Sequence, residues 1–268
     1  MNLPQPSAGA GTWDGTARTS GLAPLVEYTL WLGDDALVYA QRLAEWVTRA
    51  PQLEEDVALA NIGLDQLGQA RALLTYAGVV EGAGRDEDAL AYRRDERDFR
   101  NTLLVEQPNG DFAVSMARLL AFSTYQFELY TRLAGSADET LAAIAAKAVK
   151  EVAYHRDHAT QWVLRLGDGT AESHRRMQAG LDTVWPFVDE LFDGCGLVGR
   201  LGAVAVDPVE LREPWSAYVG RVVVEATLEL PDAGPPRAGG RYGLHTEVMG
   251  YLLAEMQHLH RSHPGASW

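Results

Sequence analysis

The sequence has almost no cysteine, no excess of basic residues and no long apolar segment. Its single cysteine, Cys195, cannot form a disulfide within the chain and excludes a zinc site built from several cysteines. Lys and Arg number 23 against 37 Asp and Glu, a formal net charge of −14, so the surface would repel a nucleic acid. No apolar run approaches the ~20 residues that a membrane-spanning helix needs. We therefore expect a cytoplasmic protein with no nucleic-acid or membrane partner.

Residues 1–22 are rich in Gly, Ala, Ser, Thr and Pro and contain few large apolar side chains. They lack the apolar core of a secretory signal, and their composition is typical of a disordered leader. The rest of the chain contains no alternating apolar pattern long enough for a sheet and no glycine-rich nucleotide fingerprint. We expect one helical domain over residues 23–268.

Apolar residues recur at alternating steps of three and four, the pattern of a helix with one buried face. Pro51 is expected to end the first long helix, Gly78 the second, and Asp111 is expected to cap the third. The four long helices predicted in this way span about 24–49, 54–77, 111–134 and 138–166.

Three further helices follow the long ones. The first of them contains Pro186, which is expected to kink it. A Pro- and Gly-rich linker separates the last two. The predicted spans are about 173–192, 214–230 and 244–260.

Residues 79–110 separate the two pairs of long helices. They contain a turn-rich acidic loop and a highly charged stretch that ends at the Pro108-Asn109-Gly110 turn. A crossover between two antiparallel helix pairs is typical of ferritin-like proteins. We therefore predict an all-α fold, a ferritin-like four-helix bundle with additional C-terminal helices.

Di-metal sites in such bundles repeat a Glu-x-x-His pair on two helices, and none of the four predicted long helices contains one. The third residue after Asp65 is Gly68, and the third after Glu151 is Tyr154. We therefore predict no catalytic, metal or cofactor-binding residue, and we interpret the polar side chains at these positions as a vestigial cluster. The cluster consists of Asp34, Asp35, Asp65, Glu128, Glu151, Tyr154, His155 and His158.

Buried carboxylates without a metal need positive charge from the protein. Glu151 can pair with Lys147 one helical turn earlier. The expected partners of the three aspartates are Arg42, Lys147 and Lys150.

An atypical metal site is the alternative, because two histidines lie three residues apart on the fourth long helix. The chain would then be a ferritin-like oxidase or oxygenase. The ligands would come from Asp34, Asp65, Glu128, Glu151, His155 and His158.

Two further features of the sequence bear on partners. Arg93, Arg94 and Arg97 could bind the phosphates of coenzyme A, although alternating charges are usually a solvated helix face. Tryptophans exceed what one core needs, which favours an interface. Five of the seven bear on this point: Trp31, Trp46, Trp162, Trp185 and Trp215.

Long segments spread over residues 22–268 resemble one known family. They are LGDDALVYAQRLAEW, EDVALANIGLDQLGQAR, DERDFRNTLLVEQPNGDFA, KEVAYHRDHATQWVLRLGDGTAESHRRMQ and GLHTEVMGYLLAEMQHLHRSHPGASW. The chain is similar to the structural, C-type subunit of the bacterial ring-1,2-phenylacetyl-CoA epoxidase, which acts in aerobic phenylacetate degradation.

The resemblance implies a component of an oxygenase complex that is not itself catalytic. A sister subunit of the same fold would hold the di-iron centre, and this chain would pair with it and stabilise it. A reductase with flavin and an iron–sulfur centre would supply electrons from NADPH, and small accessory subunits would complete the complex. No cofactor is expected in this chain, and the chain alone could form a homodimer through the face meant for its partner.

Overall fold

The computed structural model describes residues 23–232 and 234–266, and every regular element within them is a helix. The predicted all-α class is confirmed for this part of the chain, which holds ten α-helices and six short 3₁₀ helices. The leader predicted at 1–22 lies outside the described residues. None of the described helices is long and apolar enough to cross a membrane.

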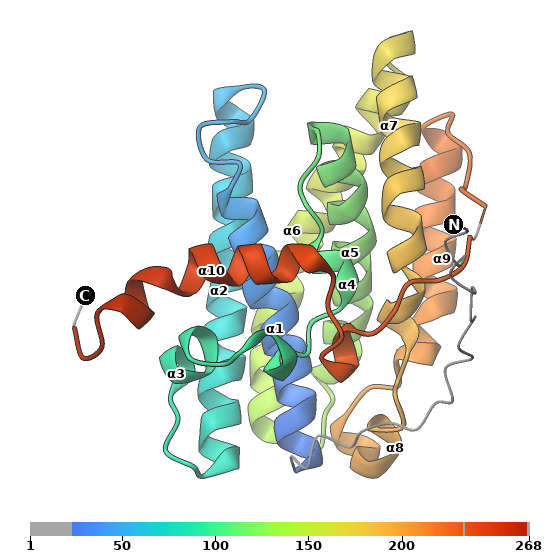
Figure 1. Ribbon diagram of the computed structural model, residues 1–268. Helices are drawn as coiled ribbons and strands as arrows, with labels where there is room; N and C mark the ends of the chain where they lie inside the picture. Colours follow the sequence, from blue (N-terminus) through green and yellow to red (C-terminus); the bar gives the residue numbers. More distant parts are fainter. Residues whose placement is uncertain (1–22, 233, 267–268) are drawn as a thin grey trace, which may run out of the picture.

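Four long helices pack side by side and form the body of the molecule (Figure 1). α2 contacts both α1 and α6, and α6 contacts α5. The ring of Tyr39 on α1 meets Phe122 of α5 edge-on at 5.0 Å between centroids, so the four helices enclose one apolar core. They are α1 (Pro24–Ala44), α2 (Leu53–Glu81), α5 (Phe112–Leu133) and α6 (Glu139–Gly167).

Shorter helices surround this body. α7 and α9 pack on α5 and α6, whereas α10 runs across the long helices, on the side of α3 and α4 (Figure 1). Their bounds are α3 (Glu87–Tyr92), α4 (Leu103–Glu106), α7 (Ala171–Val184), α8 (Val198–Leu201), α9 (Arg212–Glu225) and α10 (Glu247–Ser262).

α1 ends five residues earlier than predicted, so Pro51 does not end it. The backbone turns after Ala44, and Thr48 adopts a positive φ of 69°. The Thr48 N–H donates to both carboxylate oxygens of Asp56, at 2.8 and 3.0 Å. This acid in the first turn of α2 therefore fixes the connection between the two helices.

α2, in contrast, continues past Gly78, where the sequence predicted its end. It stops at Glu81, and Gly82 takes the left-handed conformation that closes it. A Cβ on Gly78 would lie 2.1 Å from the carbonyl oxygen of Arg85. Gly78 is thus needed for a close approach of the following loop rather than for a turn.

Proline ends α7 instead of kinking it. The helix stops at Val184, and 3₁₀ turns over Trp185–Phe187 and Asp189–Phe192 replace its predicted last part. Pro186 has no N–H to donate to the preceding turn, so the α-helical hydrogen bonds cannot continue. The predicted cap at Asp111 is confirmed, because its carboxylate accepts from the Val114 N–H at 3.0 Å.

The five tryptophans expected at an interface lie in or against the core instead. Trp31, Trp46 and Trp215 are buried in the core. Trp162 and Trp185 are half-buried against it. The Trp46 indole N–H donates to the Ser115 hydroxyl at 3.0 Å, so this ring ties the turn after α1 to α5.

The crossover (residues 82–110) lies against a second stretch, the C-terminal segment (residues 239–246). The buried carboxylate of Glu190 accepts the N–H groups of Leu103, Gly239 and Gly240 at 2.6–2.8 Å. A Cβ on Gly240 would lie 2.0 Å from the carbonyl oxygen of Asn101. The two stretches therefore touch backbone to backbone, and only glycine fits at that contact.

A second carboxylate fastens α10 to the crossover. The side chains of Glu106 and His245 are shielded from solvent and lie 2.7 Å apart. Glu106 also accepts the N–H and hydroxyl of Thr246, the residue just before α10, each at 2.7 Å. Burial alone would lower the pKa of His245, but the hydrogen bond and charge of Glu106 outweigh it and the pKa is raised.

We expect the His245→Gln variant to lose more stability in mildly acidic buffer than in alkaline buffer. A histidine whose folded-state pKa is raised contributes stability below its unfolded pKa of about 6.5, and this is lost as pH rises through the folded value. Thermal unfolding at pH 6 and pH 9 measures the difference. His258→Gln, at an exposed position on α10, is the control. An equal loss at both pH values in His245→Gln would contradict the charged pair.

Candidate functional site

The eight polar residues predicted to form one cluster lie in separate places. Asp65, Glu151 and His155 share a hydrogen-bond network between α2, α5 and α6. Asp34 and Asp35 are bound instead by the crossover and the C-terminal segment. The remaining three, Glu128, Tyr154 and His158, have other neighbours.

The centre of the network is a pair of glutamine side chains, which we call the amide pair. Gln66 of α2 donates to Gln126 of α5 at 2.7 Å, and Gln126 donates back at 3.0 Å. Both side chains are almost wholly buried. The reciprocal bonds satisfy both amides, so the polar interior carries no net charge here.

Hydrogen bonds extend from the amide pair to a charged group on each side. On one side Gln66 Nε2 lies 3.5 Å from His155 Nδ1, and His155 Nε2 lies 3.0 Å from Asp65. On the other side Gln126 donates to Gln69 at 3.5 Å, and Gln69 donates to Glu151 at 3.0 Å. Lys147 lies 3.5 Å from Glu151, which confirms the pairing predicted for that acid. Within the described residues Asp65 pairs with His155, where a lysine or arginine was expected.

Burial lowers the pKa of His155 below that of an ordinary histidine, although Asp65 acts in the opposite direction. At neutral pH the ring is therefore uncharged. Because the Gln66 amide is a donor, Nδ1 accepts and Nε2 carries the proton that points to Asp65. His155 acts as a hydrogen-bonding link within the network.

His158 belongs to a second pair, one turn further along α6. Its Nε2 lies 3.1 Å from Glu55 of α2, and burial lowers its pKa against the opposing effect of that carboxylate. Tyr154 is more than half exposed on the surface. Glu128 forms ion pairs with Arg132 at 2.8 Å and Arg156 at 3.8 Å.

Asp34 is fully buried and its partner is Arg94 of the crossover. The guanidinium donates to both carboxylate oxygens, to Oδ2 at 2.9 Å, and the Arg100 N–H donates to the same Oδ2 at 2.8 Å. Arg94 also lies over the Phe99 ring at 4.2 Å. This corrects two predictions, because Arg42 is not the partner and Arg94 faces inward, away from any phosphate.

Asp35, the next residue, binds the far end of the chain. Arg241 donates to its Oδ2 at 2.7 Å, and Thr102 donates to its Oδ1 through the N–H at 2.7 Å. Arg241 is itself buried and donates to the Trp31 carbonyl at 3.1 Å. The lysine expected here lies elsewhere, because Lys150 is exposed on α6.

The residues at the centre do not fit a di-metal site. A metal pair needs lone pairs directed at one point, from carboxylates and imidazoles. Here the amide N–H groups of Gln66 and Gln126 occupy that point. In the described part of the chain, no three His, Cys, Asp or Glu side chains gather closely enough to hold a metal ion.

The sequence reasoning missed the amide pair and Gln69. Gln66 and Gln126 follow the buried Ile62 and Phe122 by one helical turn. Both glutamines therefore lie on the apolar stripe of their helix, and this position could have indicated that they are buried and hydrogen-bonded. The sequence reasoning also overlooked one Glu-x-x-His pair, Glu255 and His258, which lies outside the long helices. Both side chains are exposed on α10, away from the core.

We expect Asp34→Ala to destabilise the protein by about 3–5 kcal/mol, because it leaves the buried Arg94 charge uncompensated. The matched control is Asp189→Ala, whose partner Arg212 is half exposed, with an expected loss below about 1 kcal/mol. Urea unfolding of both variants measures the difference. Equal losses would contradict the structural role of the buried pair.

Two comparisons with known proteins agree with the resemblance seen in the sequence. The profile of the phenylacetic acid catabolic protein family matches residues 13–268. The chain is 51% identical over 246 residues to the C-type subunit of 1,2-phenylacetyl-CoA epoxidase from Escherichia coli (strain K12). These residues cover 91% of this chain and 99% of that relative. With a match over nearly its whole length, the chain belongs to the phenylacetic acid catabolic protein family.

Proposed function

We propose that the chain is a non-catalytic structural subunit of a phenylacetyl-CoA 1,2-epoxidase. It pairs with the di-iron catalytic subunit, stabilises it, and so takes part in aerobic phenylacetate catabolism in the cytoplasm. The similarity to the C-type subunit of the Escherichia coli epoxidase supports the place in the complex. The chemistry of the core supports the non-catalytic role.

The amide pair is the observation that carries this proposal. In a di-iron bundle the helices direct carboxylates and imidazoles at one point. Here α2 and α5 direct Gln66 and Gln126 at each other, and their hydrogen bonds are already complete. Asp34 and Asp35, which stand on the adjoining helix, are held by arginines.

The ferritin-like fold is part of the same proposal. α1 and α2 form one helix pair, α5 and α6 form the other, and the crossover joins them. This order of two pairs and a crossover is typical of ferritin-like proteins. Residues 23–268 then form one domain, with α7, α9 and α10 packed around the bundle.

The proposal places the reaction centre and the cofactors in other subunits. The di-iron centre belongs to the sister subunit, and flavin, the iron–sulfur centre and the NADPH site belong to the reductase. This chain contributes no residue to the reacting atoms. Its contribution is the rigid surface against which the catalytic subunit and the small accessory subunits assemble.

Co-expression with the catalytic subunit tests the proposal. We expect one complex that contains both chains and stays together at micromolar concentration in size-exclusion chromatography with light scattering. The catalytic subunit should also unfold at a higher temperature in the complex, because binding to the folded state stabilises it. Separate elution of the two chains at micromolar concentration would refute the proposed function.

A further inference from the structure

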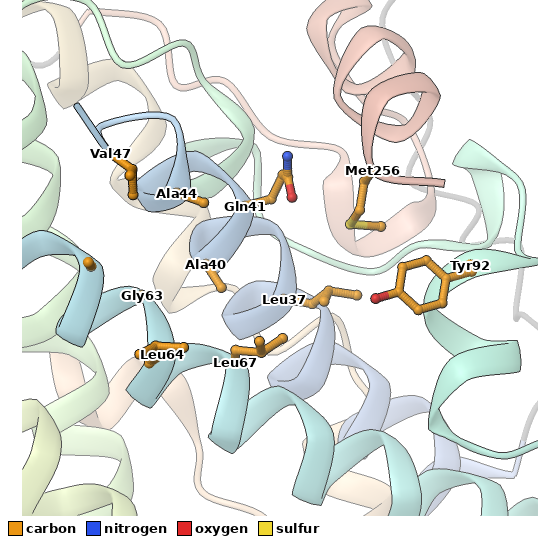
Figure 2. A pocket seen from close by; sticks show the side chains of 11 residues that line it. Leu37, Ala40, Gln41, Ala44, Val47, Gly63, Leu64, Leu67, Tyr92 and Met256 are labelled. Carbon is orange, nitrogen blue, oxygen red and sulfur yellow. The ribbon is translucent and has the colours of Figure 1, made fainter. Parts of the chain in front are cut away.

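An apolar groove runs along the outer side of α1 and α2, facing away from the core. It is a cavity of about 340 Å³ that opens to solvent. Figure 2 shows Leu64 and Leu67 of α2 on one side of it and Ala40 and Ala44 of α1 on the other. Tyr92 and Met256 lie at one end, where α3 and α10 meet the long helices.

The residues of the groove follow the spacing of a helix-packing seam. On α2 the seam alternates steps of four and three, and on α1 and the turn after it the steps are three, four and three. Such a heptad pattern brings apolar side chains of one helix against those of another. The seam of α2 consists of Ala60, Leu64 and Leu67, which line the groove, and of Leu53 and Val57, which continue the same helix face beyond it.

This seam is distinct from the stripe with which α2 faces the core. Leu59, Ile62 and Leu73 are fully buried on the core stripe, whereas the large residues of the seam are exposed. α2 thus has two apolar faces, and among residues 23–232 and 234–266 only one of them is covered. A helix with a second apolar face is expected to pack against a further element.

The seam exposes as much apolar surface as the largest patch on a typical monomer, and such a patch is often functional. Leu53, Val57, Leu64, Leu67 and the neighbouring Val47 are each 45–74% exposed. Together they expose roughly 500 Å² of apolar surface, against about 300–600 Å² for the largest patch on a typical monomer and about 800 Å² per partner in a standard interface. The seam alone could supply more than half of one side of a stable interface.

The shape and charge of the groove indicate which kind of partner surface can bind there. Small residues, among them Ala40, Ala44 and Gly63, line its middle and let another backbone approach closely. No lining residue is charged. A second copy of this chain is disfavoured, because two molecules of net charge −14 repel each other.

We propose that this groove binds an amphipathic α-helix of the catalytic subunit, with uncharged apolar residues at alternating steps of three and four. The inference rests on the proposed function, which requires such a partner, and adds the surface where it binds. Between two antiparallel helices, a third helix buries apolar residues in the groove while its own backbone hydrogen bonds stay intact. Leu64 and Leu67 then lie at the centre of the interface.

The test compares Leu64→Glu with Val224→Glu in the full chain. Leu64 is 64% exposed in the groove, and Val224 is 72% exposed on α9. Figure 1 places α9 at the far side of the molecule from α2. We expect Leu64→Glu to raise the dissociation constant for the catalytic subunit at least about 10-fold, because a charge would be buried without a partner. Val224→Glu should leave it within about 2-fold of the unchanged chain.

The outcomes separate this inference from the proposed function. If the unchanged chain does not bind the catalytic subunit, the proposed function fails. If it binds and Leu64→Glu binds equally well, or if Val224→Glu weakens binding as much, only the groove assignment is overturned. A homodimer that Leu64→Glu breaks without weakening the mixed complex would also overturn it.

Thermal unfolding of each variant verifies that it is folded before binding is measured. Hydrogen exchange of the unchanged chain gives a second readout that needs no substitution. We expect residues 53–67 to become more protected when the catalytic subunit is added. Protection confined to α7 and α9 would overturn the assignment.

Discussion

Two neighbouring carboxylates on α1, Asp34 and Asp35, hold the crossover and the C-terminal segment against the long helices. Each is buried and each meets an arginine that is also buried. Desolvating such charges is costly, and the cost is offset only when the geometry is good and the remaining oxygens are hydrogen-bonded. Both conditions are met, because backbone N–H groups of the crossover complete the two carboxylates. The position of α10, and with it one end of the groove, follows from these contacts.

The interior between α2, α5 and α6 follows a different principle. There a neutral pair of amides, Gln66 and Gln126, lies at the centre, and the charged Asp65 and Glu151 lie at the two ends of the hydrogen-bond network. Such a network links three helices, provided that every buried member is satisfied. A core completed by protein groups does not need a metal ion for its stability. The structural role that we propose would then depend on the surface, and the second apolar face of α2 supports that proposal.

Periodic apolar residues were sufficient to predict the four long helices, and Asp111 was recognised as a cap from its residue type and position. The end of α1 could not be predicted, because Asp56 of the next helix captures the Thr48 N–H. The partners of the buried aspartates were also missed. Asp34 and Arg94 are 60 residues apart, and Asp35 and Arg241 are 206 apart, so no local pattern links them. For the site, the sequence showed that the metal-ligand motifs are incomplete. It did not indicate that Gln66 and Gln126 meet in the core, because only acids and histidines were considered as site residues.

The central claim is that protein groups, not a metal, complete the interior of this chain. Metal analysis by inductively coupled plasma mass spectrometry tests it most directly, on untagged protein from iron-rich medium purified without chelator. The account predicts less than about 0.1 equivalent of iron, manganese or zinc, because amide N–H groups face the centre and a complete carboxylate–histidine site normally retains its ion. One or two equivalents that survive dialysis would contradict it. His155 and Glu151 would then be candidate ligands, and the chain would have to be assayed as an oxygenase.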